Sequence, residues 1–331
     1  MKRRTLLKLS AALVAAASFT ALPTAAAGAP IKLRTVSFLP QNHGSSWGFK
    51  RYAELLNEAG KGRIEIDYVG GPEAIKAFEQ PEAVRTGAVD AAYTVGAYYK
   101  TMIPEANSMS LSQLTPWQER ESGYFDHMQS LHKAKNLYLL GRQLVNSPFI
   151  LSTSKTKVTS PRDLKGMKFR TAALYDGMYK KLGIVGITMP LGDQYSALER
   201  GLVDGTASSP SSALRFSLYE VNKYVIGPLF FGANNGVLMI NLDTWKKIPA
   251  DLQKLMQEVQ LRVERETWDH YGSALSKQIA QLKGKGMEFV EWSAAENQWF
   301  LDTAYTANWA EIEGKTSKET VEKLKRLTRK R

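Results

Sequence analysis

Arg170 is the residue whose type and position best suit it to bind a ligand. It ends a short predicted strand, and a helical run that extends to Gly183 follows it. Ligand sites in α/β sheets lie at the carboxyl ends of strands, beside the next helix. A guanidinium presents a rigid fork of N–H donors that matches the two oxygens of a carboxylate. The sequence therefore predicts a carboxylate site at Arg170, with an ion pair to a structural acid such as Asp163 as the alternative.

The segment around Arg170, residues 160–210, has the pattern of a strand-helix-strand-helix unit. After the first helix, residues 188–191 predict a second strand, and a second helix follows through Gln194, Ala197 and Leu198. Gly201 can end that helix with a positive φ, and residues 203–205 then turn the chain back. Such a unit indicates an α/β protein with Arg170 at one edge of a sheet.

The same segment resembles the signature of the solute receptors of tripartite ATP-independent periplasmic (TRAP) transporters. The resemblance extends from about Leu33 to about Ala310. It implies a two-lobed, type II-like periplasmic-binding-protein fold, in which two mixed-sheet α/β domains are joined by crossing strands and a long spanning helix. The matching residues are Asp163-Leu164-Lys165-Gly166-Met167-Lys168-Phe169-Arg170, Leu182-Gly183 and Ala197-Leu198-Glu199-Arg200-Gly201-Leu202-Val203-Asp204-Gly205.

The resemblance also implies a role for Arg170, because the arginine at this motif position holds the ligand's carboxylate in the family. The family often places an asparagine shortly after the valine-aspartate-glycine motif. Here the corresponding residues, 204–210, are one residue longer and carry Ser208 and Ser209 instead. We expect one of these hydroxyls to act where an amide is usual, and this departure puts the second polar anchor of the site in doubt.

Further candidate ligand-binding residues come from loops expected at the same edge of the two sheets. Any one of their aromatic side chains is more often part of a core than of a pocket. As a group they indicate an aromatic-walled cleft with a few polar anchors, which favours a monocarboxylate with an aromatic or short apolar body over a sugar acid. The residues are Phe38, Asn42, Trp47, Tyr98, Tyr99, Gln143, Asn146, Tyr175, Phe231, Asn234 and Asn235.

The remaining pattern indicates how the chain is divided into domains. Residues 31–38, 63–69 and 91–95 predict strands of a first lobe, and the extended stretches 137–154 and 219–241 are expected to cross between lobes. Residues 249–284 predict one long helix, with a kink at Gly272. We expect a first lobe of residues 28–147 plus 236–275, a second of residues 148–235 plus 276–314, and a basic C-terminal tail of residues 315–331 that is a solvated helical end.

The N-terminus has the three parts of an export signal. Lys2-Arg3-Arg4 is positive, residues 6–22 are apolar, and Ala25-Ala26-Ala27 offers a cleavage site. We expect residues 1–27 to be a signal peptide cleaved near Ala27, and the mature chain to be periplasmic. The run from Arg3 to Lys8 approaches the twin-arginine pattern, so general secretion and twin-arginine export both stay open.

The formal net charge of +12 is concentrated at the two ends of the chain. The leader contributes +4 and residues 315–331 contribute +6, which leaves +2 for the body, so a nucleic-acid footprint is not indicated. Cysteine is absent, which excludes disulfides and thiolate metal sites. His127 and His132 are five positions apart and so do not share a helix face. Neither a nucleophile elbow nor a phosphate loop follows a strand.

These observations favour a binding protein over an enzyme. We expect a monomeric periplasmic receptor for a small organic acid, with no cofactor and no metal, which delivers its ligand to the integral membrane subunits of a TRAP-type permease. The alternatives are a periplasmic enzyme on a similar two-lobed fold, which would turn over the bound acid, and a sensor-input module, which would need a signalling partner.

Overall fold

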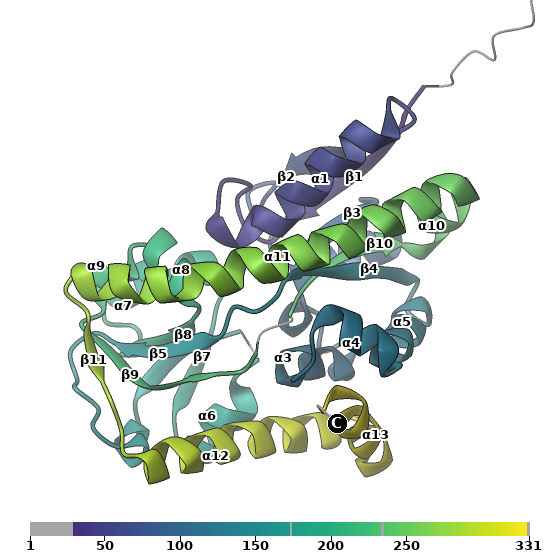
Figure 1. Ribbon diagram of the computed structural model, residues 1–331. Helices are drawn as coiled ribbons and strands as arrows, with labels where there is room; N and C mark the ends of the chain where they lie inside the picture. Colours follow the sequence, from purple (N-terminus) through teal and green to yellow (C-terminus); the bar gives the residue numbers. More distant parts are fainter. Residues whose placement is uncertain (1–28, 173, 233–234, 330–331) are drawn as a thin grey trace, which may run out of the picture.

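The computed structural model describes residues 29–172, 174–232 and 235–329, and these residues form two lobes, each around one mixed sheet (Figure 1). Lobe I holds a sheet in the order β2-β1-β3-β10-β4. Strands β1, β2 and β3 are parallel, and β10 runs antiparallel to both β3 and β4. The strand bounds are β1 (Ile31–Ser37), β2 (Ile64–Gly70), β3 (Ala91–Val95), β4 (Leu137–Leu144) and β10 (Gly236–Asn241).

Lobe II holds a sheet in the order β11-β9-β5-β8-β6-β7. Strand β6 pairs in parallel with β7 and β8, whereas β5 is antiparallel to β8 and β9. The predicted two-lobed fold is thereby confirmed, since the chain passes from lobe I to lobe II between β4 and β5 and returns between β9 and β10. The strand bounds are β5 (Phe149–Thr153), β6 (Lys168–Thr171), β7 (Val185–Thr188), β8 (Gly205–Ser208), β9 (Tyr224–Phe230) and β11 (Glu288–Val290).

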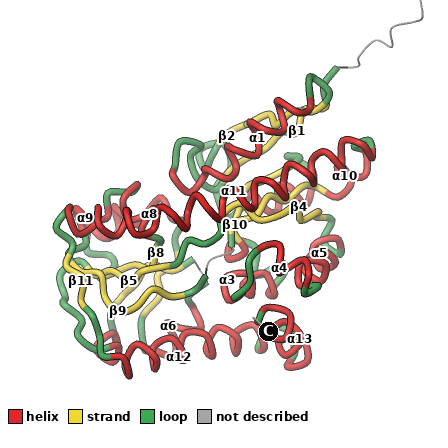
Figure 2. The backbone as a smooth tube through the Cα atoms, viewed as in Figure 1, coloured by secondary structure: helices red, strands yellow, loops and turns green. Residues whose placement is uncertain are grey.

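Shorter helices cover the sheets of both lobes (Figure 2). Those of lobe I are η1 (Gly44–Ser46), α1 (Trp47–Gly60), α2 (Gln80–Thr86), η2 (Gly96–Tyr98), η3 (Pro104–Asn107), α3 (Ser108–Leu111), α4 (Pro116–Glu121), α5 (Tyr124–Lys133) and α10 (Leu242–Lys247). Those of lobe II are η4 (Pro161–Leu164), α6 (Asp176–Leu182), η5 (Leu191–Asp193), α7 (Gln194–Glu199), α8 (Pro210–Arg215) and α9 (Leu218–Val221).

The strand predicted at residues 188–191 is wrong in position. Helix α6 ends against Gly183, which has a φ of 71°, and β7 begins two residues later, at Val185. Its partner β6 fixes this register, because Lys168 pairs with Val185. The strand ends at Thr188 because Pro190 has no N–H to give to a sheet, and residues 191–193 form η5 instead.

A single long helix, α11 (Ala250–Gly284), spans both lobes, as predicted (Figure 1). It packs against α1 and β4 of lobe I and against α8 of lobe II. Its 35 residues extend about 52 Å at 1.5 Å per residue. Gly272 serves close packing, because a Cβ there would meet the amide of Asn146, whose Nδ2 donates to the carbonyl of Trp268 at 3.2 Å.

Two further helices, α12 (Ala294–Glu313) and α13 (Lys318–Thr328), lie on the side of the molecule opposite α11 (Figure 1). Helix α12 packs along α6 and β9 of lobe II and reaches α3 of lobe I, while α13 packs on α5. The expectation of a solvated end is wrong for α13, because Val321 and Leu324 are fully buried and the N–H of Gln113 donates to the carbonyl of Thr328 at 3.0 Å. The solvated end was predicted from the many basic residues of this segment, which do not indicate that one face of the helix is apolar and buried.

Among the described residues, no helix combines the length and the apolar composition that crossing a membrane requires.

Candidate ligand-binding site

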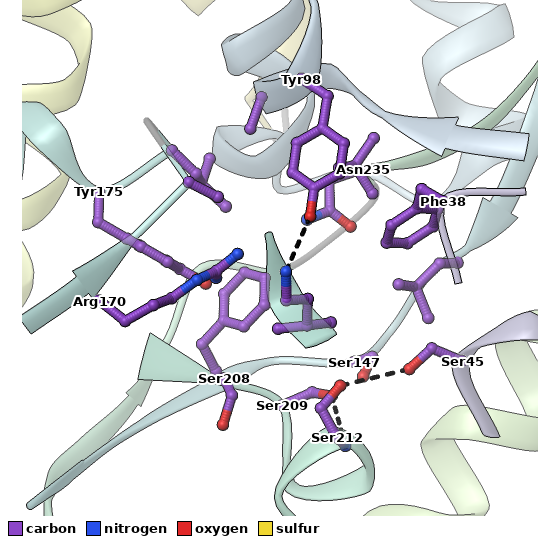
Figure 3. A pocket seen from close by; sticks show the side chains of 17 residues that line it. Phe38, Ser45, Tyr98, Ser147, Arg170, Tyr175, Ser208, Ser209, Ser212 and Asn235 are labelled. Atoms are coloured by element: carbon purple, nitrogen blue, oxygen red, sulfur yellow. Dashed lines mark hydrogen bonds between the residues drawn. The ribbon is translucent and has the colours of Figure 1, made fainter. Parts of the chain in front are cut away.

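Residues from both lobes surround a cavity of about 50 Å³ that lies where β1, β3, β6 and β8 end (Figure 3). The cavity therefore lies at the carboxyl edge that the sequence pattern predicts for Arg170. Its lining consists of Phe38, Ser45, Val95, Ala97, Tyr98, Leu144, Ser147, Phe149, Arg170, Ala172, Leu174, Tyr175, Leu191, Ser208, Ser209, Ser212 and Asn235.

Arg170 reaches this cavity from β6, which is paired on both sides by β7 and β8. Its side chain is buried, its Nε donates to the carbonyl of Met189 at 3.0 Å, and its Nη2 has no hydrogen-bond partner among the described residues. The alternative partner, Asp163, instead accepts from the N–H of Ser160 in a capping box. The guanidinium is thus held by this backbone bond and by the neighbouring hydroxyl of Tyr98, while its Nη2 is open to an anion.

Two buried tyrosines flank the guanidinium (Figure 3). The hydroxyl of Tyr98, from lobe I, accepts from the N–H of Leu191, in lobe II, at 3.2 Å. Burial raises the pKa of both Tyr98 and Tyr175, and the positive charge of Arg170 opposes this shift only in part. Both phenols are therefore neutral at pH 7 and keep a proton to donate.

The aromatic walls are built from edge-to-face contacts. Phe38 and Tyr98 have ring centroids 5.6 Å apart at an interplanar angle of 90°, and Phe149 and Tyr175 have centroids 5.5 Å apart at the same angle. Such contacts fix ring positions and leave the cavity mostly apolar. The predicted aromatic-walled cleft is present, although Phe149 was not among the residues proposed for it.

Serine hydroxyls contribute part of the remaining lining. Ser208 and Ser209, the two residues that replace the family's usual asparagine, both line the cavity. The side-chain oxygen of Ser208 is buried without a partner among the described residues, as is Oδ1 of Asn235. Ser209 caps α8, because its Oγ accepts from the N–H of Ser212 at 3.2 Å.

Four predicted site residues lie away from the cavity, three of them because other contacts hold their side chains. Each was predicted from its place near a strand end, and such a place does not determine the direction of a side chain. Asn42 is exposed to solvent, Trp47 stacks on His270 with centroids 4.1 Å apart, Tyr99 bonds Nε2 of His132 at 3.0 Å, and Gln143 donates to Gln260 at 3.0 Å.

Three more predicted residues do not line the cavity. Asn146 is turned toward α11, where it donates to Trp268. Phe231 packs between Phe230 and Tyr305, with ring centroids at 5.0 Å and 5.1 Å. Asn234 lies outside the described residues.

Three serines that line the cavity were not predicted from the sequence. Ser45, Ser147 and Ser212 are small polar residues in loops or at helix starts, and such residues are common at exposed turns. Only Ser212 carried a local clue, because it follows the capping Ser209 by three residues and so lies on the same side of α8.

The electrostatics of the site are simple. Among the described residues that line the cavity, Arg170 is the only one with a charged side chain. His43 lies next to Ser45, and its Nδ1 accepts a hydrogen bond from the N–H of Ser45 at 3.0 Å. Burial and the positive charge of Arg215 lower the pKa of His43 to about 4. It is therefore neutral at pH 7. The described residues contain no group of three His, Asp or Glu side chains that could hold a metal ion.

A buried cation at the strand ends of two lobes, with long helices across both, defines a two-lobed solute-binding protein. Residues 36–315 match the family model of the bacterial extracellular solute-binding protein, family 7. The chain belongs to this family of extracellular solute-binding proteins. The family is one of binding proteins and not of enzymes.

Individual relatives are distant in sequence and similar in fold. The chain is 22% identical to a monocarboxylate 2-oxoacid-binding periplasmic protein of Nostoc sp., over 88% of this chain and 84% of that protein. It is 25% identical to a C4-dicarboxylate-binding periplasmic protein of Rhodobacter capsulatus, over 76% and 78%. A TRAP solute-binding protein of Desulfovibrio salexigens, solved with orotic acid, has a TM-score of 0.79 at 19% identity, with 90% of this chain and 97% of that chain covered.

A receptor of Bordetella pertussis that binds pyroglutamic acid has a TM-score of 0.78 at 17% identity, with 90% of this chain and 99% of that chain covered. At these identities the solved structures bear on the fold alone, and the choice of ligand must be argued from this chain's own cavity.

Proposed function

We propose that this protein is a periplasmic receptor that binds a short monocarboxylate through Arg170 and presents it to a TRAP-type membrane permease. The observation that carries the proposal is the state of Arg170, which is only 2% exposed and has an unpartnered Nη2 at the cavity. A buried charge without a counterion is costly, so an anion in the cavity would offset that cost.

The charge of the cavity argues for one carboxylate and against two. A second carboxylate would lie among serine hydroxyls and aromatic rings, with no further cation among the described lining residues to offset its desolvation. The small volume also favours a compact acid. The names of the relatives divide between 2-oxoacid monocarboxylates and C4-dicarboxylates, and the single cation here supports the first group.

The proposal also includes export of the chain to the periplasm and delivery of its ligand to the membrane permease. The two named relatives are periplasmic, which supports the same location for this chain. The proposed signal peptide of residues 1–27 lies outside the described residues, as does cleavage near Ala27, and the two export routes stay open. The membrane partner is inferred from membership of the family. We also keep the proposed lobe boundaries, because each sheet lies largely within its expected segments.

The test is native mass spectrometry of the protein purified from periplasm, followed by calorimetric titration of the ligand-free protein with short mono- and dicarboxylates. We expect one molecule of an unchanged monocarboxylic acid per chain, and tighter binding of monocarboxylates than of dicarboxylates with the same carbon number. A bound molecule without a carboxyl group, or a preference for dicarboxylates, would overturn the proposal. Conversion of the bound acid to a new product would instead support the enzyme alternative.

A further inference from the structure

A row of serine hydroxyls connects the two lobes along one side of the cavity (Figure 3). Ser209 and Ser212 come from α8 of lobe II, and Ser45 comes from η1 of lobe I. Oγ of Ser209 donates to Oγ of Ser212 at 3.1 Å, and Oγ of Ser212 lies 3.4 Å from Oγ of Ser45. This row lies on the other side of the cavity from the guanidinium of Arg170 (Figure 3).

A count of hydroxyl protons shows that the row has one donor more than it uses. A serine hydroxyl has one proton to donate and two lone pairs. Ser209 accepts from the N–H of Ser212 and gives its own proton to the Ser212 hydroxyl. Either hydroxyl of the Ser212–Ser45 pair can be the donor, and the proton of the other is then left without an acceptor among the described residues. When Ser212 donates to Ser45, it is the proton of Ser45 that is available to a ligand in the cavity.

Other polar atoms around the cavity are also available. Oγ of Ser208 and Oδ1 of Asn235 are buried without partners among the described residues, and the Ser147 side chain also lines the cavity. Buried polar groups are nearly always hydrogen-bonded in folded proteins. All of these groups are uncharged, so they suit an uncharged oxygen and not a second carboxylate.

From this arrangement we infer the class of the ligand, an inference that rests on the proposed function. The ligand is a short hydroxy- or oxo-monocarboxylate, whose carboxylate binds Arg170 and whose hydroxyl or keto oxygen accepts the proton of Ser45. Because Ser45 belongs to lobe I and Arg170 to lobe II, such a ligand contacts both lobes at once. A plain fatty acid of the same length offers Ser45 no such acceptor.

The experiment compares acids of one carbon number by calorimetric titration. The panel is butanoate, its 2-, 3- and 4-hydroxy derivatives, and 2-oxobutanoate. We expect at least one oxygenated acid to bind about fivefold to tenfold more tightly than butanoate, as one added hydrogen bond predicts. In Ser45→Ala we expect this advantage over butanoate to disappear. Ser212→Ala, which removes the donor to Ser45, is expected to reduce the advantage less.

Ser211→Ala is the matched control, because Ser211 lies on the same helix beside Ser212 but outside the cavity lining. It should keep the full preference for the oxygenated acid. If butanoate binds as tightly as every oxygenated acid, or if Ser45→Ala keeps the preference for the oxygenated acid, the serine row does not bind the ligand's hydroxyl or keto oxygen. In that case binding that still depends on Arg170 leaves the proposed function intact. If no acid of the panel binds, both proposals fail.

Discussion

The guanidinium of Arg170 is the group that we assign to the ligand's carboxylate, and its removal tests that assignment directly. We expect Arg170→Ala to weaken binding of the cognate acid by about 2–5 kcal/mol, which corresponds to a factor of about thirty to several thousand in Kd. Arg170→Lys should recover only part of this loss, because an ammonium keeps the charge but not the two-pronged geometry. Calorimetric titration measures both.

Arg200→Ala is the control for this substitution. Arg200 is exposed, and in the described residues it bonds only to Ser196 on its own helix. Its loss should leave Kd unchanged. An unchanged Kd in Arg170→Ala would show that Arg170 is a structural residue and would remove the carboxylate clamp from the proposed function.

Two buried histidines should make stability depend on pH. Burial lowers the pKa of His43 and His132 to about 4. Because these values lie below the value of 6.5 in the unfolded chain, the unfolded state takes up protons first as the pH falls. Stability is therefore complete above pH 6.5 and is lost between pH 6.5 and 4. We expect a loss of about 2 kcal/mol per histidine at pH 5, measured by urea unfolding.

The variant that checks this origin is His132→Gln. Its amide can replace the bonds of the imidazole to the hydroxyl of Tyr99 and the carbonyl of Met128. We expect the variant to lose only about half as much stability as the parent between pH 7 and 5. Equal losses in both proteins would show that His132 does not contribute to the pH dependence.

At the residue scale, the sequence identified side chains most consistently where a long motif surrounded them, although Tyr98 and Tyr175, proposed from loops, also line the cavity. Arg170, Ser208 and Ser209 fall within or next to such a motif, and all three line the cavity. Tyr99 and Asn42 were proposed from their places near strand ends, yet one is bonded inside the core and the other is exposed. The direction of a side chain depends on tertiary packing, which local spacing does not contain.

An ion-pair cluster connects elements of the two lobes outside the cavity. Lys100 follows η2 of lobe I, and its Nζ lies 2.8 Å from Asp176 of α6 and 2.9 Å from Glu311 of α12. Burial alone would lower the pKa of Lys100, but its bonds to these two carboxylates raise it, so the lysine is charged at pH 7. We therefore expect the cluster to favour the arrangement of the lobes that surrounds the ligand.

Lys100→Met should weaken ligand binding without changing the lining of the cavity. A loss of about 1–2 kcal/mol in the preference for this arrangement would raise Kd by roughly fivefold to thirtyfold, because the competent form becomes less populated. X-ray scattering of the ligand-free variant should also show a larger radius of gyration than the parent. Lys180→Met, at an exposed site on α6, is the control. A parent-like Kd in Lys100→Met would argue that the cluster does not influence lobe closure.

At the element scale, prediction succeeded where periodicity was long and failed where a helix or strand was short. Helix α11 was predicted nearly to its ends, because its apolar positions repeat over many turns. The strand predicted at residues 188–191 lies three residues too late for β7, because the register of β7 depends on its partner β6 and not on its own sequence. Helix α13 was taken as solvated because its basic residues outnumber the buried Val321 and Leu324.

For the whole molecule, the sequence indicated two lobes but not how they meet. The crossing stretches were visible as extended apolar runs, and they correspond to β4–β5 and β9–β10. The contact between Tyr98 and Leu191 joins residues 93 positions apart. Contacts of this range leave no local pattern, so the cavity that they help to form could be expected only in outline.

Because the cavity is built from both lobes, ligand binding should stabilise the whole molecule. With the acid at about one hundred times its Kd, the expected gain is about 2.7 kcal/mol, or a rise in Tm of roughly 4 °C for a chain of this length. Arg170→Ala at the same acid concentration should gain less than about a third of that free energy, since its Kd is at least about thirtyfold higher. Sodium chloride at equal ionic strength controls for a salt effect. A rise in Tm of equal size in both proteins would show that the acid stabilises the fold without using the cavity.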